Sequence, residues 1–271
     1  GYKALEDYED GAGNGHNTAV GASSQLNATT GEFNTSLGSL SMGAGVTTGN
    51  HNTVLGYNSG ISLTSGGENM IIGSFAGDNL TSGTRNVAIG YAALTTEDQH
   101  GLNTAVGYQA LKLLNANANA VNTAIGYNAG ASLVAGVNNS IVGGNAGDAM
   151  TSGSNNSIMG YDAGTALTTG VQNVLIGSSA SDALLTGERN VVMGHGALGA
   201  ANGSESRNTA IGWSALAVLD NDGNNSNTAI GYASGFAATT GANNTLIGSQ
   251  AGDALTTGSN NIIIGATAAA S

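Results

Sequence analysis

A five-residue motif, Asn-x-x-aliphatic-Gly, recurs along almost the whole chain and constrains its fold more than any other feature. The fifteen anchor asparagines are Asn17, Asn34, Asn52, Asn69, Asn86, Asn103, Asn122, Asn139, Asn156, Asn173, Asn190, Asn208, Asn227, Asn244 and Asn261. Most intervals between them are 17 residues, and the others are 18 or 19. A short fixed period over a whole chain is typical of a solenoid, in which each repeat buries its apolar side only against its neighbours.

Counting the anchor as position 0, position 4 is always Gly, position 7 is always Ala or Ser, and position 11 is often Leu or Met. Position 3 is always aliphatic: Val20, Leu37, Leu55, Ile72, Ile89, Val106, Ile125, Val142, Met159, Ile176, Met193, Ile211, Ile230, Ile247 and Ile264. The β-branched residues of the motif, bounded by turn residues, predict a short strand. Helix is disfavoured, because each interior Gly costs a helix about 1 kcal/mol relative to Ala.

The sequence therefore predicts an all-β fold, a parallel β-solenoid (β-roll or β-helix) of about fifteen 17-residue coils over residues 17–271, preceded by an irregular leading repeat at 1–16. We expect a ladder of anchor amides that hydrogen-bond from coil to coil and tolerate a left-handed turn. Its members include Asn52, Asn69, Asn86, Asn103, Asn122 and Asn139. The position 3 aliphatics, such as Ile72, Ile89, Ile125, Ile176, Ile211, Ile230 and Ile247, are expected to form a buried spine, and the position 11 leucines a second one.

The small residues at positions 4 and 7 indicate that another segment packs closely there. A neighbouring chain is the expected partner, because a 17-residue coil can barely enclose a two-layer core. A homotrimer is therefore predicted. A longer rhythm, in which pairs of coils containing Ala-Leu follow coils containing Ala-Gly or Ser-Gly, is explained by duplication of multi-coil blocks. The 19-residue coils are expected to bulge at the surface.

Composition excludes several classes of function. A net charge of −12 with only five Lys and Arg residues argues against binding to nucleic acid. The longest apolar runs are only a few residues, so no insertion into a membrane is expected. The chain has no Cys, so it can form neither a disulfide nor a thiolate metal site.

No catalytic constellation is visible in the repeats, and we predict a non-enzyme with no cofactor. His16, His51, His100 and His195 occupy different repeat contexts and pair with no recurrent carboxylate. No nucleophile elbow, phosphate-binding loop or zinc-ligand spacing is present. The histidines are therefore interpreted as surface or turn residues.

Four aspartates share position 9 and are the weak candidates for a metal site: Asp78, Asp148, Asp182 and Asp253. Calcium prefers several oxygen ligands, and β-roll turns can supply them. These coils are not consecutive, however, so one coil offers only one carboxylate, and a role as turn residues is favoured. The acidic run from Glu6 to Asp10 is interpreted as a solvated face.

Position 5 carries aromatic residues in many coils, namely Tyr57, Tyr91, Tyr108, Tyr127, Tyr161, Trp213 and Tyr232. Aromatic faces can stack on the sugars of a host-surface glycan, or they can cover apolar surface between chains while their polar atoms stay wet. Packing is the favoured interpretation, because the repeat supplies few polar partners of varied type.

The stretches Asn103–Leu111 (NTAVGYQAL) and Asn122–Gly130 (NTAIGYNAG) resemble the repeats of bacteriophage tail-fibre and related appendage proteins. They are similar, more loosely, to the head repeats of trimeric autotransporter adhesins. The resemblance covers residues 17–271 and implies a homotrimeric fibre segment of a virion or cell surface. Such fibres often carry a C-terminal chaperone that is cut away. Because Gly1–Leu5 matches positions 4–8 of a repeat, the chain is expected to be a processed product or part of a longer polypeptide.

Three functions follow from this sequence. The leading one is a rigid, non-catalytic fibre shaft that joins other fibre or baseplate sections and positions a host-binding end. The second is a cell-surface adhesin or an extracellular filament that assembles end to end, since a contact that does not close on itself generates a filament. The third is an ice-binding solenoid, which needs a regular Thr face. Position 1 breaks that face at Met70, Val87, Val174, Val191 and Ile262.

Overall fold

The computed structural model describes residues 1–6 and 15–269, so Asp7–Asp10 of the acidic run lie outside the described residues. The fold is all-β, a β-solenoid of about fifteen coils about 17 residues apart, each contributing one three-residue parallel strand. The chain divides into two compact units, Gly1–Val137 and Asn138–Ser271. The prediction of a parallel β-solenoid is confirmed.

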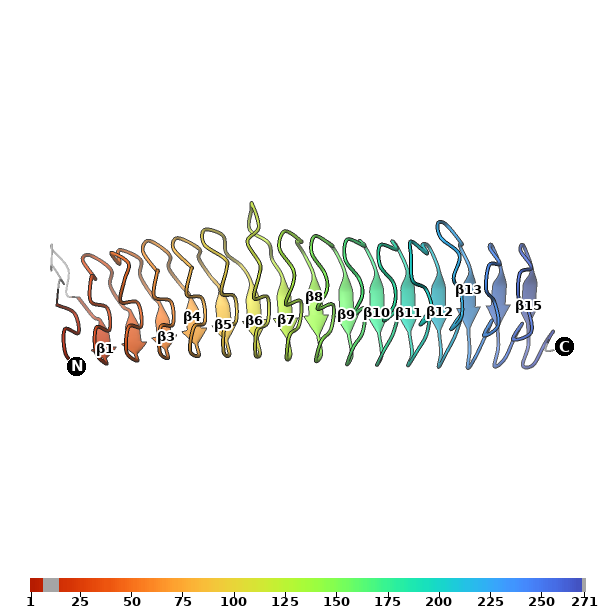
Figure 1. Cartoon of the computed structure of the whole chain (residues 1–271), viewed down its shortest axis with the longest axis horizontal. Coiled ribbons are helices and arrows are strands. Elements are labelled where there is room, and N and C mark those ends of the chain that lie inside the picture. Colours follow the sequence, from red (N-terminus) through yellow and green to blue (C-terminus); the bar gives the residue numbers. More distant parts are fainter. Residues whose placement is uncertain (7–14, 270–271) are drawn as a thin grey trace. The chain divides into compact units, whose positions relative to one another are not determined.

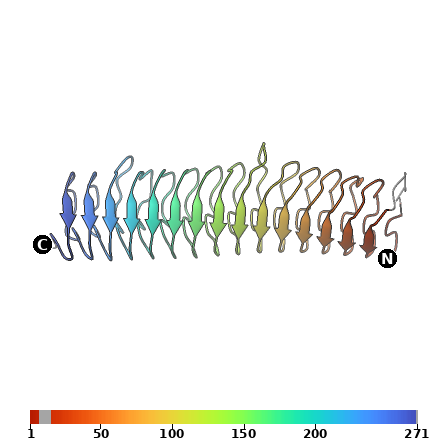
Figure 2. The ribbon, with the colours of Figure 1, turned by 180° about the vertical axis from the view of Figure 1, so that it is seen from behind.

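Strands follow one another in chain order within each unit (Figures 1 and 2). The first unit contains β1 Thr18–Val20, β2 Thr35–Leu37, β3 Thr53–Leu55, β4 Met70–Ile72, β5 Val87–Ile89, β6 Thr104–Val106 and β7 Thr123–Ile125. The second contains β8 Ser140–Val142, β9 Ser157–Met159, β10 Val174–Ile176, β11 Val191–Met193, β12 Thr209–Ile211, β13 Thr228–Ile230, β14 Thr245–Ile247 and β15 Ile262–Ile264. Equivalent positions are paired, as in Thr104 with Thr123 and Val106 with Ile125.

The anchor asparagines form the expected ladder. The main-chain N–H of Asn69 donates to Oδ1 of Asn52 at 3.1 Å, and its side-chain amide donates to the same oxygen at 3.0 Å. That amide also donates to the carbonyl of Gly83 at 2.9 Å, which ties the strand to the turn at the end of its own coil. Asn52 and Asn69 are buried, so these bonds replace water that the amides have lost.

The anchor does not adopt the left-handed conformation, contrary to our prediction, whereas several other positions of each coil do. Among the described residues, the position before the anchor has positive φ, as in His51 (φ 60°), Glu68 (φ 60°) and Arg85 (φ 58°). The anchor itself enters the strand, where its main-chain N–H must face the amide of the previous anchor. The reversal of the chain therefore falls one residue earlier.

The glycine at position 4 ends each strand and is required for two reasons at once. Gly177 has φ 131°, a conformation that side chains with a Cβ strongly disfavour. A Cβ on Gly177 would also lie 2.7 Å from the carbonyl carbon and oxygen of Gly194 in the next coil. Stacked coils therefore approach each other closely along this column of glycines.

The core lies on the inward side of the strands, and it corrects one prediction. The inward residue is position 2, as in Ile71, Ile158 and Leu175, which are buried, whereas the position 3 aliphatics point outward. The outward aliphatics Ile72, Ile89, Ile125, Ile176, Ile211, Ile230 and Ile247 are intermediate or exposed. These aliphatic residues remain in register from coil to coil, but they form no buried spine. Side chains alternate across a strand, and the anchor amide faces inward, so position 3 must face outward.

Position 11 supplies the second buried column, as predicted, with Leu63, Leu80, Leu133, Met150, Leu167 and Leu184 fully buried and Leu255 intermediate. Position 7 is buried inside the coil, as Ala76 and Ser234 show. The expectation that a neighbouring chain packs against position 7 is therefore wrong. One coil encloses its own core, because side chains at this position are small enough for the two sides of the coil to meet.

The alternation of Ala-Gly and Ala-Leu coils has a packing cause. In most coils where position 8 is Gly, a large side chain of the next coil fills the space: a Cβ on Gly164 would lie 2.8 Å from Cδ1 of Leu175. Gly77 is an exception, because Ala88 follows it in the next coil and Ile71 of its own coil lies beside it. Where position 8 is Leu, position 2 of the next coil is Ala, as in Leu198 followed by Ala210. In these pairs a small residue on one coil is therefore matched by a large one on the next, which keeps the core filled.

The two 19-residue coils differ from the rest at their turns. The segments that join β6 to β7 and β12 to β13 project beyond the neighbouring loops in Figure 1. Each follows a coil that holds a fully buried glutamate, Glu97 in the first unit and Glu205 in the second. Glu205 accepts hydrogen bonds from the main-chain N–H of Asn221 and Gly203 at 3.2 and 3.1 Å.

Candidate functional site

An outward-facing apolar surface runs along the strands of each unit. It is made of the position 3 residues, which we call the aliphatic row. The outward residues at position 1 flank this row and are Thr or Ser in most coils. In the first unit Val20 is 52% exposed and Ile125 is 42% exposed, and in the second unit Met159 is 52% exposed. Exposed apolar surface of this continuity marks an interaction site in soluble proteins.

Beside this row in the first unit lies a continuous aromatic column formed by Tyr57, Phe75, Tyr91, Tyr108 and Tyr127. Tyr91 and Tyr108 stack with ring centroids 5.3 Å apart, and Tyr108 and Tyr127 stack at 5.2 Å. Tyr57, Phe75 and Tyr91 make edge-to-face contacts at 5.5 and 5.8 Å. The stacking distances are close to the spacing of about 4.8 Å between neighbouring strands, so the solenoid itself sets the geometry of the column.

Phe75 was missed by the sequence analysis, which considered only position 5. It stands at position 6, next to Ser74, and bridges the coil that lacks a position 5 aromatic. A search for aromatics at either of the two positions that follow the strand-ending Gly finds it. Tyr161 lies in the second unit, is exposed, and has no aromatic neighbour within the described part of the chain.

Trp213 and Tyr232 form the corresponding stack in the second unit, with centroids 5.0 Å apart and planes 10° from parallel. They line a pocket of about 240 Å³ together with Phe236, Gln250 and Asp253. Three aromatic rings thus meet an amide and a carboxylate. This combination supplies the varied polar partners that the repeat by itself does not predict.

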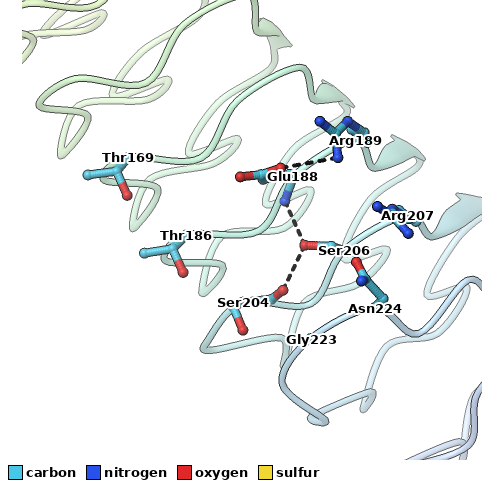
Figure 3. A pocket seen from close by; sticks show the side chains of 9 residues that line it. All are labelled: Thr169, Thr186, Glu188, Arg189, Ser204, Ser206, Arg207, Gly223 and Asn224. Atoms are coloured by element: carbon cyan, nitrogen blue, oxygen red, sulfur yellow. Dashed lines mark hydrogen bonds and ion pairs between the residues drawn. The ribbon is translucent and has the colours of Figure 1, made fainter.

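A second, wider pocket of about 480 Å³ lies on the loops of the second unit (Figure 3). Several of its polar groups are paired with one another: the Ser206 hydroxyl accepts from the Glu188 N–H at 2.9 Å and donates to the Ser204 carbonyl at 2.7 Å. Arg189 lies 3.4 Å from the Glu188 carboxylate. None of the lining residues is a histidine or a cysteine, and the one carboxylate in the lining is that of Glu188.

The four position 9 aspartates are intermediate in burial and lie on separate coils. Burial raises the pKa of Asp78, Asp148 and Asp182, and the nearby Asp162 carboxylate raises the last two further. Within the described residues, none of the four belongs to a group of three or more metal-ligating side chains. The carboxylates of Asp78, Asp148 and Asp182 are also bonded to main-chain N–H groups of their own turns, as Asp78 is to Asn79, which is how turn aspartates act.

Glu97, Asp98 and His100 do form such a group, with one ligand atom of each within 4.8 Å of the others. Sequence reasoning missed it because His100 was compared with the other histidines and not with its equivalents in other coils. His16 and His51 instead stack on Phe33, at 5.1 and 5.0 Å. The available signal was the loss of the usual Leu-Thr-x-Gly turn in this coil.

Comparison of the chain with protein-family models, with curated proteins and with solved structures found no match. The described residues contain no helix that is long and apolar enough to cross a membrane.

Proposed function

We propose that this chain is a non-catalytic structural segment of an extracellular or virion appendage, such as a tail-fibre shaft, and that it works as a homotrimer. The proposal extends the resemblance of NTAVGYQAL and NTAIGYNAG to tail-fibre repeats. Stacked coils held by the asparagine ladder provide stiffness, because each coil is hydrogen-bonded to the next without a flexible linker.

The observation that carries the trimer is the aliphatic row. The core of each coil is already closed by positions 2, 7 and 11, so the chain's own folding gives no reason for an aliphatic residue at position 3 of every coil. A further copy of the same chain has the same spacing between coils, so its aliphatic row can pack on this one at every coil. Packing between copies also covers the aromatic column and leaves its hydroxyls in water.

The oligomeric state of the whole chain tests this proposal. Native mass spectrometry or light scattering is expected to give three copies at micromolar concentration. Substitution of Leu55 and Ile125 by Ser removes two exposed members of the row, and we expect dissociation with the β-sheet circular dichroism signal retained. Thr53→Ala, on the same outward face, is the control and leaves the trimer intact. A wild-type chain that stays monomeric at all concentrations, or forms only dimers, contradicts the proposal.

A cell-surface adhesin that binds a host glycan is the second candidate, and the Trp213 pocket favours it. Parallel Trp and Tyr rings offer a flat apolar platform. The Gln250 amide can both donate and accept hydrogen bonds with sugar hydroxyls, and the Asp253 carboxylate can accept them. Binding to a panel of immobilised polysaccharides is expected to be lost in Trp213→Ala. It is expected to survive in Tyr161→Ala, which removes an isolated exposed ring of the same unit. Equal loss in both variants, or no binding by the wild type, rules the pocket out.

Ice binding is the weakest candidate. Thr18, Thr35 and Thr53 do face outward at position 1, but Met70 and Val87 occupy the same position in the next two coils and interrupt the row of threonines. A thermal-hysteresis assay on the wild-type chain is the direct test.

A further inference from the structure

One turn of the first unit departs from the repeat in a chemically specific way. In the Asn69 coil the turn residues are Leu80, Thr81 and Gly83, and the residues 17 positions later are Glu97, Asp98 and His100. Two carboxylates and one imidazole thus replace an aliphatic side chain, a hydroxyl and a glycine. The preceding coil shows what the turn needs in order to fold, so these three replacements call for another explanation.

Glu97 takes the place of a core leucine and is fully buried. Its Oε1 accepts the main-chain N–H of His100 at 3.0 Å, and the main-chain N–H groups of Ala116 and Gln99 also lie close to the carboxylate. No hydrogen bond reaches its buried Oε2. His100 Nδ1 lies 3.5 Å from Glu97 Oε1 and is also buried without a hydrogen-bond partner. Buried polar atoms without a hydrogen bond destabilise the folded chain, and here two of them belong to neighbouring side chains of the kind that bind metal ions.

The main chain of this turn is fixed in place. The carbonyl of Asp98 accepts the N–H groups of Thr81 and Ser82 at 2.7 and 3.1 Å. The carbonyl of His100 accepts the side-chain amide of Asn86 at 3.1 Å. The three ligand side chains therefore extend from a backbone that is already hydrogen-bonded to the neighbouring coil and to the asparagine ladder, which lowers the entropy cost of holding an ion.

Glu205 provides an internal comparison. It is also fully buried and also precedes a 19-residue coil, but each of its carboxylate oxygens accepts a main-chain N–H, from Asn221 and from Gly203. A buried glutamate that serves only the main chain of a long coil can therefore be fully satisfied. Glu97 is not, and in Glu97 the free oxygen occurs together with Asp98 and His100.

We propose that Glu97, Asp98 and His100 bind one divalent transition-metal ion of the zinc class. One imidazole nitrogen and two carboxylate oxygens are a ligand set that Zn²⁺ and Co²⁺ accept, with water in the remaining position. A cation placed among these atoms supplies the partner that Glu97 Oε2 and His100 Nδ1 lack. The ion would fasten the turn from which the chain enters the first 19-residue coil, and this role is independent of the proposed fibre function.

The experiment uses the whole chain after treatment with a chelator and its removal. Titration with Zn²⁺ by calorimetry is expected to show one site per chain, and Co²⁺ is expected to give a visible absorption spectrum that Zn²⁺ abolishes. Ca²⁺ at the same concentration is expected to compete poorly. Zn²⁺ should also raise the thermal midpoint of unfolding, because it binds the folded state.

Two variants test the ligands without endangering the fold. Glu97→Leu restores the residue found at the equivalent position of the preceding coil, and His100→Ala keeps a Cβ where the backbone already carries one. Loss of a second-shell partner alone weakens metal binding about 10- to 100-fold, so each variant is expected to bind Zn²⁺ at least about tenfold more weakly. Glu205→Gln and His51→Asn are controls that leave binding unchanged. Wild-type affinity in both ligand variants, or no Zn²⁺ binding by the wild type, overturns the proposal.

Discussion

The two sides of each three-residue strand are under different physical constraints, although all their residues are aliphatic or small. In β9, Ile158 faces inward and is fully enclosed, whereas the next residue, Met159, faces outward and is 52% exposed. On the inward side, the size of a side chain is limited by the side chain of the neighbouring coil that packs against it, as the contact of Gly164 with Leu175 shows. On the outward side nothing in the chain explains why position 3 is always aliphatic.

This difference separates folding from assembly. Residues of the inward side close the core of the monomer, so their replacement acts on the stability of a single chain. Residues of the aliphatic row contribute little to that core, so their replacement acts on whatever covers them. The predictions below sharpen or break this separation, beginning with the largest expected effect.

Gly177→Ala, at the end of β10, is expected to destabilise the chain by about 3–5 kcal/mol, because it combines a strained backbone with a clash against Gly194. Gly144→Ala is the matched control in the same unit. Its nearest contact would be the Tyr161 ring at 3.5 Å, and its φ is compatible with a side chain, so we expect a change within about 1 kcal/mol. Chemical denaturation measures both. Similar stabilities for the two variants would show that stacked coils can separate at this column.

Ile158→Ala is expected to cost about 2–5 kcal/mol, because it leaves a cavity in the core. Met159→Ala, one residue along the same strand, is expected to change the stability of the monomer by less than about 1 kcal/mol. If copies associate through the aliphatic row, the thermal midpoint of unfolding should depend less on protein concentration in Met159→Ala than in the wild type. An equal loss of monomer stability in the two variants contradicts the division into inward and outward sides.

Because a residue at position 8 shares space with position 2 of the next coil, a second substitution at one position is expected to restore stability lost at the other. Leu175→Ala creates a cavity, and Gly164→Leu alone clashes with Leu175, so each is expected to destabilise by about 2–4 kcal/mol. The double variant reproduces the natural combination of Leu198 with Ala210, in which Leu also has positive φ (51°). We expect a favourable coupling of at least about 1 kcal/mol in a double-mutant cycle. Additive effects would mean that the two positions do not share space.

Of the predicted effects on stability, the smallest comes from protonation of the turn aspartates. Burial raises the pKa of Asp78, so the unfolded chain loses this proton first and stability falls as pH rises through the window between the unfolded and folded pKa values. Asp78→Asn is expected to be slightly more stable than the wild type above that window and equal to it below.

Glu68 is the control, because its pKa is shifted in the opposite direction. Its bond to Arg85 lowers the pKa of Glu68, so the stabilisation it gives is present above the unfolded pKa and is lost as pH falls through the folded pKa. Both carboxylates lie in the first unit. Thermal melts of Asp78→Asn and Glu68→Gln between pH 3 and 7 measure the two dependences. If the difference in thermal midpoint between Asp78→Asn and the wild type does not change with pH, the charge of Asp78 is not its cause.

Most of the fold could be predicted from spacing alone, because a 17-residue period leaves few ways to bury apolar side chains. The side of the strand that faces inward could not. Asn-Thr-Ala-Ile-Gly places its largest aliphatic at position 3, and that size suggested burial. The inward direction is set instead by the anchor amide, which must reach the previous anchor and the Gly carbonyl of its own coil, as Asn69 does with Asn52 and Gly83.

The candidate sites were predictable to a smaller degree. The position 5 aromatics were found by their period, but Phe75 was missed because it enters the same column from the next residue. Glu97 at a leucine position is an irregularity that the repeat itself exposes. That its Oε2 lacks a partner, while both oxygens of Glu205 are bonded, depends on main-chain positions that no spacing reveals.

The amino-acid sequence by itself determined the parallel coils, their number and their register, because anchors, glycines and small residues recur at intervals that only stacking satisfies. Tertiary structure alone decided which side of the strand closes the core, that one coil is wide enough to enclose it, and which side chains of different coils meet. Those outcomes depend on how far apart two stretches of backbone lie across the coil. That distance is fixed by the packing of Ala, Leu and Gly side chains together, and by no single position of the repeat.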